Sequence, residues 1–239
     1  MERFTRHDVL AAAAGSGDAS NADLSGINLS NAELIGVCFD GSNLSGGNLA
    51  GANLSGATFE NCNLSGCNMS GANCTAASFR GAELTSADLT FAVLVGADLS
   101  EAKLQGTDLT NSLIAAACFD RADLSEANLQ MTDGGAASYR GANMTRVACR
   151  GASMIGADLS GSDLTRSKLY GTDLSAANLT NAVLEGADIL EATFTAANLT
   201  NVNLISARVK RSDMTRAKLP GLKYDDSLAD TILKYDKKR

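Results

Sequence analysis

Three of the six cysteines in the chain lie close together in residues 60–74, which read ENCNLSGCNMSGANC. Cysteine thiolates bind zinc and carry out redox chemistry, so such a cluster raises the question of a metal or redox site. A structural zinc site takes four ligands, usually Cys and His, and the only histidine of the chain is His7. The choice between a metal site and buried packing therefore depends on where each thiol points, and the repeat pattern predicts that.

A period of five residues runs without an insertion from residue 22 to residue 219. Typical units read NADLS, GINLS, GADLS and AANLT. Each unit is centred on a large apolar residue, most often Leu, and two positions earlier it has a small residue, most often Ala. Five matches neither the period of a helix nor that of a strand. It fits a chain that turns a corner every five residues, with Leu and Ala inward and backbone hydrogen bonds between stacked coils.

These units resemble the A-(D/N)-L-x-x motif of the pentapeptide-repeat family, over about 200 of the 239 residues. The resemblance implies an all-β solenoid, a right-handed quadrilateral β-helix with four pentapeptides per coil. At this length, about ten four-sided coils are expected. The aromatic centres support four sides, because five of the six lie at multiples of twenty residues from one another: Phe39, Phe59, Phe79, Phe119 and Tyr139.

A solenoid exposes its apolar interior at both ends, so short helical caps are expected there. We predict an N-terminal helical cap in residues 1–20, the β-helix in residues 21–219, and a C-terminal cap or dimerisation segment in residues 220–239. Thr5 and Asp8 are residue types that begin a helix.

The C-terminal segment is predicted to form a helix that begins at Asp226 or Ser227 and runs to about residue 237. Its apolar side would consist of Leu228, Ile232, Leu233 and Tyr235. Two interpretations stay open: the helix caps the solenoid, or it joins two copies into a homodimer. The second follows from a loose resemblance of this end to family members that protect topoisomerases, the quinolone-resistance type.

In the repeat register, Cys62 and Cys67 take the small inner position and Cys74 takes a centre. All three point inward from different sides of the coil, where a free Cys behaves as a small hydrophobe. The sequence thus predicts packing and no metal. Cys38 and Cys118 are expected to point outward.

The unit MTDGG has Gly134 in place of a large central residue. An unfilled interior position destabilises a core, so a local bulge or kink is expected there.

No constellation of catalytic groups stands out from the repeat. We therefore predict no enzyme activity, no cofactor and no metal. The N-terminal sequence MERFTRHDVLAAAAGSG is too short and too polar for a signal peptide or a membrane span. A cytoplasmic protein with reduced cysteines is expected, which binds neither a membrane nor nucleic acid directly.

Function is then expected on the outer faces. Outward apolar residues are rare, and four of them gather on or beside one face within two coils: Phe91, Val93, Val95 and Leu113. Cations gather beside Tyr170 on one edge of the second half: Arg146, Arg150, Arg166 and Lys168. These cations either pair with acidic residues of adjacent coils or form a patch for an anionic partner or a second copy.

Charge differs between the two halves of the chain. Residues 1–119 hold 4 Lys or Arg against 12 Asp or Glu, whereas residues 120–239 hold 16 against 15. The first hypothesis is a non-catalytic scaffold that presents the faces of a rigid rod to a protein partner. The alternative, implied by the resemblance, is a DNA mimic that binds a type II topoisomerase (DNA gyrase) and protects or inhibits it. Even the acidic half reaches only about half the charge density of duplex DNA, which favours the first hypothesis.

Overall fold

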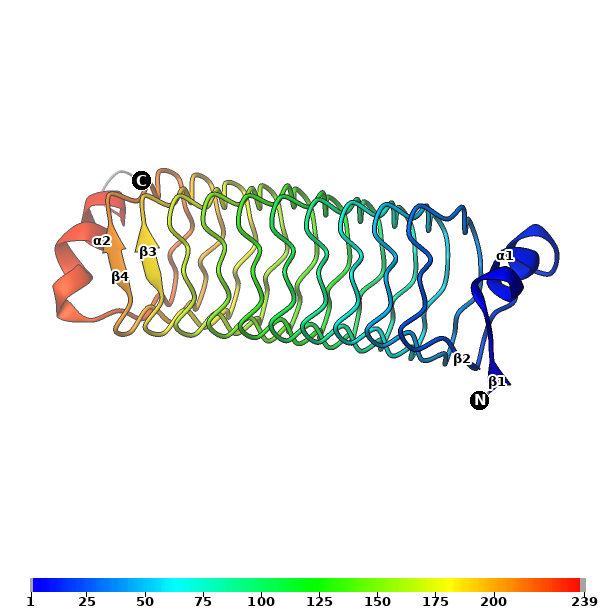
Figure 1. The fold of residues 1–239 in the computed structure, drawn as a ribbon. Coiled ribbons are helices and arrows are strands. Elements are labelled where there is room, and N and C mark those ends of the chain that lie inside the picture. Colours follow the sequence, from blue (N-terminus) through cyan, green and yellow to red (C-terminus); the bar gives the residue numbers. More distant parts are fainter. Residues whose placement is uncertain (1, 237–239) are drawn as a thin grey trace.

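The computed structural model describes residues 2–236, which form an elongated rod of stacked coils (Figure 1). Residues twenty apart pair in parallel along the rod, from Asp18 with Cys38 to Asn203 with Lys223. One coil therefore contains twenty residues, or four units of five, and each residue at a paired position bonds to the residue twenty positions later. Backbone hydrogen bonds run from coil to coil, as predicted; the Leu44 N–H, for example, donates to the Asn63 carbonyl at 2.7 Å.

Regular strands are short because each side of a coil is short. β1 (Glu2–Arg3) pairs in parallel with β2 (Ala22–Asp23), and β3 (Asp188–Leu190) pairs in parallel with β4 (Arg208–Lys210). Elsewhere the contact between coils is a single bridge on each side. β1 was not predicted, since residues 1–20 were expected to contribute only a helix.

The interior is filled by the inward central and Ala positions, as the repeat predicted. On one side of the rod the rings of Phe39, Phe59 and Phe79 stack with centroid distances of 5.0 and 4.9 Å. Phe119 and Tyr139 stack in the same way at 5.0 Å. The prediction that five of the aromatic centres share one side is confirmed.

The clustered cysteines are buried, as predicted. The thiol of Cys62 donates to the Ser42 carbonyl at 2.9 Å, and that of Cys67 donates to the Leu44 carbonyl at 2.8 Å. Burial raises the pKa of Cys67 to about 11 and that of Cys74 to about 12, so both thiols stay protonated at neutral pH.

The predicted bulge at Gly134 is wrong. The pairing of Asp133 with Leu113 and Ser153 continues through this coil, and the Gly134 N–H donates to the Ser153 carbonyl at 2.8 Å. The side chain of Ile114, one coil earlier, takes the space, because a Cβ at Gly134 would lie 3.3 Å from its Cδ1 and Cγ1 atoms. A neighbouring coil thus fills the position and the backbone stays regular.

A helix lies at each end of the rod (Figure 1). The first, α1 (Arg6–Ala14), begins after Thr5 as predicted: the Asp8 carboxylate accepts from the Thr5 N–H at 2.7 Å, and the Thr5 hydroxyl oxygen accepts from the Asp8 N–H at 3.3 Å. Val9 of α1 is fully buried in the core.

The C-terminal helix begins later than predicted. A 3₁₀ turn, η1 (Asp226–Leu228), comes first and α2 (Ala229–Asp236) follows. The Asp225 carboxylate accepts from the Ser206 N–H at 2.6 Å, which ties this turn to the last coils. Leu228 and Ile232 are buried in the core, whereas the side chains of Leu233 and Tyr235 lie outside the described part. Neither helix of residues 2–236 has the length and hydrophobicity of a membrane span.

Candidate interaction surface

Outward side chains twenty residues apart form columns along the rod, and apolar residues gather in neighbouring columns of one face. We call this set the apolar patch: Phe91, Val93, Val95, Leu113, Met131 and Ile155. Val93 and Leu113 are paired residues of adjacent coils. The exposed fraction is 65% for Phe91, 44% for Leu113 and 62% for Met131, so large apolar side chains are exposed to solvent here. The structure therefore brings together the four residues that the sequence predicted.

Met131 and Ile155 were missed by the sequence prediction. Met131 falls in the same column as Phe91, two coils further on, and Ile155 falls in the column of Val95. Between Val95 and Ile155 that column holds only Ala115 and Gly135, so no hydroxyl interrupts it. The signal was present in the twenty-residue register, which the prediction followed over two coils only.

The apolar patch replaces a side-chain hydrogen bond that recurs on the rod. One coil before it, the Asn73 Oδ1 atom accepts from the backbone N–H of Thr75 at 3.1 Å and from its hydroxyl at 2.7 Å. Val93 and Val95 hold the corresponding positions and make no such bonds. The patch thus gives up local hydrogen bonds and exposes apolar surface, a combination typical of a contact site.

The corner residues of the patch adopt a backbone conformation that favours glycine. Phe91 and Met131 both have φ of 58°. A non-glycine residue in this region costs about 1 kcal/mol. The Met131 side chain runs over the next coil, where its Sδ atom lies 2.6 Å from the position that a Cβ atom on Gly151 would take. Large apolar side chains at such corners project from the edge of the rod.

An open groove of about 510 Å³ lies next to the patch, on the adjoining face. It is lined by Gln130, Ala148, Arg150, Lys168, Tyr170, Asp188 and Leu190. The guanidinium carbon of Arg150 lies 5.2 Å from the centroid of the Tyr170 ring. A hydrogen bond to the Glu191 carboxylate raises the pKa of the Tyr170 hydroxyl, and the charge of Glu191 adds to this effect.

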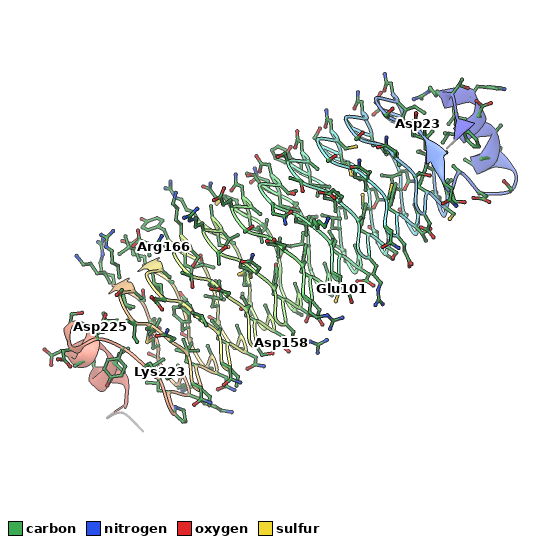
Figure 2. The ribbon with its side chains drawn as sticks, turned by 90° about the horizontal axis from the view of Figure 1, so that it is seen from below. Asp23, Glu101, Asp158, Arg166, Lys223 and Asp225 are labelled. Atoms are coloured by element: carbon green, nitrogen blue, oxygen red, sulfur yellow. The ribbon has the colours of Figure 1, made fainter. Side chains whose placement is uncertain are left out.

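The cations of this edge divide into two groups. Ion pairs join Arg146 to Glu126 at 2.9 Å, Arg208 to Asp188 at 3.6 Å and Arg211 to Glu191 at 2.9 Å. Within residues 2–236, Arg150, Arg166 and Lys168 form no ion pair. Arg166 lies toward the α2 end of the rod (Figure 2), in a second groove that Arg146 and Glu185 also line. Pairing between coils therefore accounts for Arg146 but leaves the other three available.

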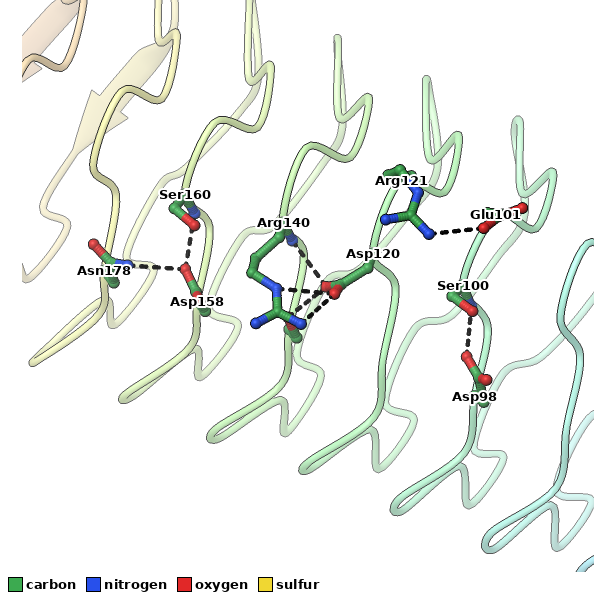
Figure 3. A network of polar contacts seen from close by, with 10 residues as sticks. Asp98, Ser100, Glu101, Asp120, Arg121, Arg140, Asp158, Ser160 and Asn178 are labelled. Carbon is green, nitrogen blue, oxygen red and sulfur yellow. Dashed lines mark hydrogen bonds and ion pairs between the residues drawn. The ribbon is translucent and has the colours of Figure 1, made fainter.

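A separate face carries a network of polar contacts between coils (Figure 3). The Asp120 carboxylate accepts from Arg140 Nε at 2.9 Å and Nη2 at 2.6 Å, and also from the Ser138 hydroxyl. On the same side, Arg121 pairs with Glu101 at 2.7 Å. Burial opposes the charge of Asp120, but the hydrogen bonds from Ser138 and Arg140 outweigh burial and lower its pKa. These contacts hold adjacent coils together.

Replacing Asp120 with Asn is expected to lower the free energy of unfolding at neutral pH, because charge-assisted hydrogen bonds are lost. The loss should be only about 1 kcal/mol, because Arg140 is largely exposed and solvent screens its charge. Since the folded pKa is below the ordinary 3.8, this stabilisation is present above that value and disappears as the pH falls through the folded pKa. Guanidinium unfolding of both proteins from neutral to acidic pH measures it. Glu101→Gln is the control and should change little, because Glu101 pairs with Arg80 and Arg121 at exposed positions where ion pairs contribute little. A pH-independent difference for Asp120→Asn would contradict the assignment.

Within residues 2–236, no three His, Cys, Asp or Glu residues form a group that could hold a metal ion. Cys38 and Cys118 are half-buried at outward positions, as predicted. Burial is the main cause that raises the pKa of Cys118.

The stacked coils and their five-residue units define a repeat protein of the β-solenoid class. A profile of pentapeptide repeats matches in eight copies, over residues 16–46, 47–85, 72–111, 92–130, 142–181 and 177–216. The chain therefore belongs to the pentapeptide-repeat family, and the family implies that the β-helix is right-handed.

Among solved structures, the chain is similar to HetL, a pentapeptide repeat protein involved in heterocyst differentiation regulation from the cyanobacterium Nostoc sp. strain PCC 7120. The two are 30% identical with a TM-score of 0.70, over 93% of this chain and 98% of HetL. A trypsin-treated variant of QnrB1, a plasmid-mediated fluoroquinolone resistance protein, is 19% identical with a TM-score of 0.59, over 82% of this chain and 94% of that one. That likeness shows the fold alone. A search of curated proteins finds no match.

Proposed function

We propose that this chain is a non-catalytic interaction scaffold, a rigid rod whose outer faces bind a protein partner. The observation that carries the proposal is the apolar patch, in which Phe91, Leu113 and Met131 are 65%, 44% and 62% exposed on one side of the rod. Burying apolar surface contributes about 25 cal/mol per Å², so these side chains supply a driving force for association.

The rest of the architecture suits this role. Each coil is hydrogen-bonded to the coils on both sides, so the columns of outward side chains are held in fixed positions. A preorganised surface loses little conformational entropy when it binds. In this proposal, residues 21–219 are the rod and residues 1–20 and 220–239 close its ends, because Val9, Leu228 and Ile232 are buried against the interior. A homodimer through the C-terminal segment is the alternative role of that end.

Photocrosslinking in the source cells tests the proposal. With p-benzoylphenylalanine in place of Phe91, irradiation is expected to yield one discrete product with a partner protein. Leu113→Ala together with Val93→Ala should remove that product, because hot-spot truncations typically cost about 2 kcal/mol or more of binding energy. The fold should persist, since Leu113 is exposed and Val93 only half-buried.

The matched control places the crosslinker at Asn181, an exposed corner residue with φ of 61° outside the apolar patch. No discrete product is expected from that position. Equal products from residues 91 and 181, or a product that survives the two alanine substitutions, would remove the patch as the contact site.

The acidic first half of the chain favours a second candidate, a DNA mimic that binds DNA gyrase and protects or inhibits it. We place it second because many of these carboxylates serve the fold. The Oδ1 atom of Asp88 accepts from the Thr90 N–H at 2.9 Å and from its hydroxyl at 2.7 Å, and Asp108 does the same with Thr110. A gyrase supercoiling assay, with and without a quinolone, separates the candidates. If micromolar protein neither inhibits the gyrase nor protects it from the quinolone, the DNA mimic is excluded.

A further inference from the structure

The groove next to the apolar patch contains two cations whose charges are not balanced by an ion pair. Arg150 and Lys168 both line it, and neither lies within ion-pair distance of a carboxylate in the described part of the chain. Asp188 also lines the groove, but its carboxylate pairs with Arg208 at 3.6 Å. The groove therefore holds two cations that are free to bind an anionic group.

The orientation of Arg150 is supported by a series of contacts. Arg211 pairs with Glu191 at 2.9 Å, the Glu191 carboxylate acts on the Tyr170 hydroxyl and raises its pKa, and the Tyr170 ring lies 5.2 Å from the Arg150 guanidinium carbon. A guanidinium over a ring face keeps its N–H donors at its edge, where they can bind a carboxylate with two parallel hydrogen bonds. The groove therefore presents a preorganised carboxylate-binding arginine beside Lys168.

The groove and the apolar patch share an edge. Gln130 lines the groove, and the next residue, Met131, belongs to the patch. The Met131 side chain reaches over Gly151, which follows Arg150 in the chain. A single bound segment can thus contact the arginine and the methionine at once.

We propose that the protein partner binds here through an acidic amphipathic segment, with carboxylates on Arg150 and Lys168 and an apolar side chain on Met131. This inference rests on the proposed function and names the chemistry of the partner. Nucleic acid fits less well, because its affinity depends on many phosphate contacts and the lining of this groove offers two cations.

Fluorescence anisotropy with a labelled peptide of Leu-Glu-Glu-Leu repeats tests the inference on the full chain. Binding is expected, with an affinity that falls about tenfold or more when Gln replaces Glu in the peptide. The variant Arg150→Glu/Lys168→Glu should show the same loss. The control Arg216→Glu/Lys218→Glu makes the same change in net charge at exposed cations outside the groove and should bind as the unmodified chain does.

No binding of the peptide, or an equal loss in the control variant, overturns the inference. So does tighter binding of a labelled oligothymidylate, which would assign the groove to nucleic acid. Crosslinking separates this result from the proposed function: with p-benzoylphenylalanine at Leu190, the captured partner peptide should be rich in Asp and Glu. A product from residue 91 without an acidic peptide from residue 190 leaves the scaffold function in place and removes only this inference. A crosslink from residue 190 to a second copy of this chain also removes the inference of an acidic partner segment.

Discussion

Replacing Phe59 with Ala is expected to lower the free energy of unfolding by about 3–5 kcal/mol. Phe59 is fully buried, with the Phe39 ring 5.0 Å to one side and the Phe79 ring 4.9 Å to the other. The coils cannot close over the vacated space, because the Phe59 N–H donates to the Ser78 carbonyl at 2.7 Å and this spacing recurs on every side. The cavity therefore stays open, and the free energy of unfolding falls by the full cost of an unfilled cavity.

Leucine substitutions separate ring stacking from simple burial. Phe194 is also buried at a central position, but no ring stacks on it among the described residues. Phe59→Leu should therefore cost more than Phe194→Leu, by about 1–3 kcal/mol, since each stacked pair contributes about 0.5–1.5 kcal/mol beyond burial. Guanidinium unfolding followed by circular dichroism measures both, with hydrogen exchange around residue 59 as the local readout. Equal losses would show that the aromatic column contributes only its volume.

Most of the fold was predictable because one physical pattern repeats. A five-residue period with Leu at its centre fits a chain that turns regularly, and the twenty-residue spacing of the aromatic centres predicted that Phe59 and Tyr139 lie on one side of the rod. The stacking of their rings was not predicted. β1 was missed because two residues, Glu2 and Arg3, are too few to show a period. Its pairing with β2 follows from the fold and not from a local signal.

The candidate site was predicted only in part, and the reason differs for its two halves. The apolar patch follows from position in the register, so Met131 was within reach of the same reasoning that found Phe91. The cations are different, because long side chains choose among several partners in range. Arg146 pairs with Glu126, twenty residues earlier, and Arg150 lies over Tyr170, twenty residues later. Lys168 has Asp188 at the same spacing, but the Asp188 carboxylate pairs with Arg208, so the register alone does not decide the outcome.

The error at Gly134 came from treating each interior position as independent. Neighbouring coils share one continuous core, so a missing side chain in one coil can be replaced by a longer one in the next. Ile114 does this at Gly134, and the backbone ladder therefore shows no disturbance.

Placing the usual Leu of the repeat at residue 134 is therefore expected to destabilise the fold. Gly134→Leu should lower the free energy of unfolding by about 1–3 kcal/mol, because the new side chain competes with Ile114 for one space. Ile114→Ala should lower it by about 2–5 kcal/mol, because Gly134 has nothing to fill the cavity. The double variant should be more stable than the two single losses predict, since leucine then occupies the space that Ile114 leaves. A double-mutant cycle on guanidinium unfolding measures this coupling. Strictly additive losses would mean that Ile114 does not fill the interior at Gly134, and the regular backbone of this coil would need another source of stability.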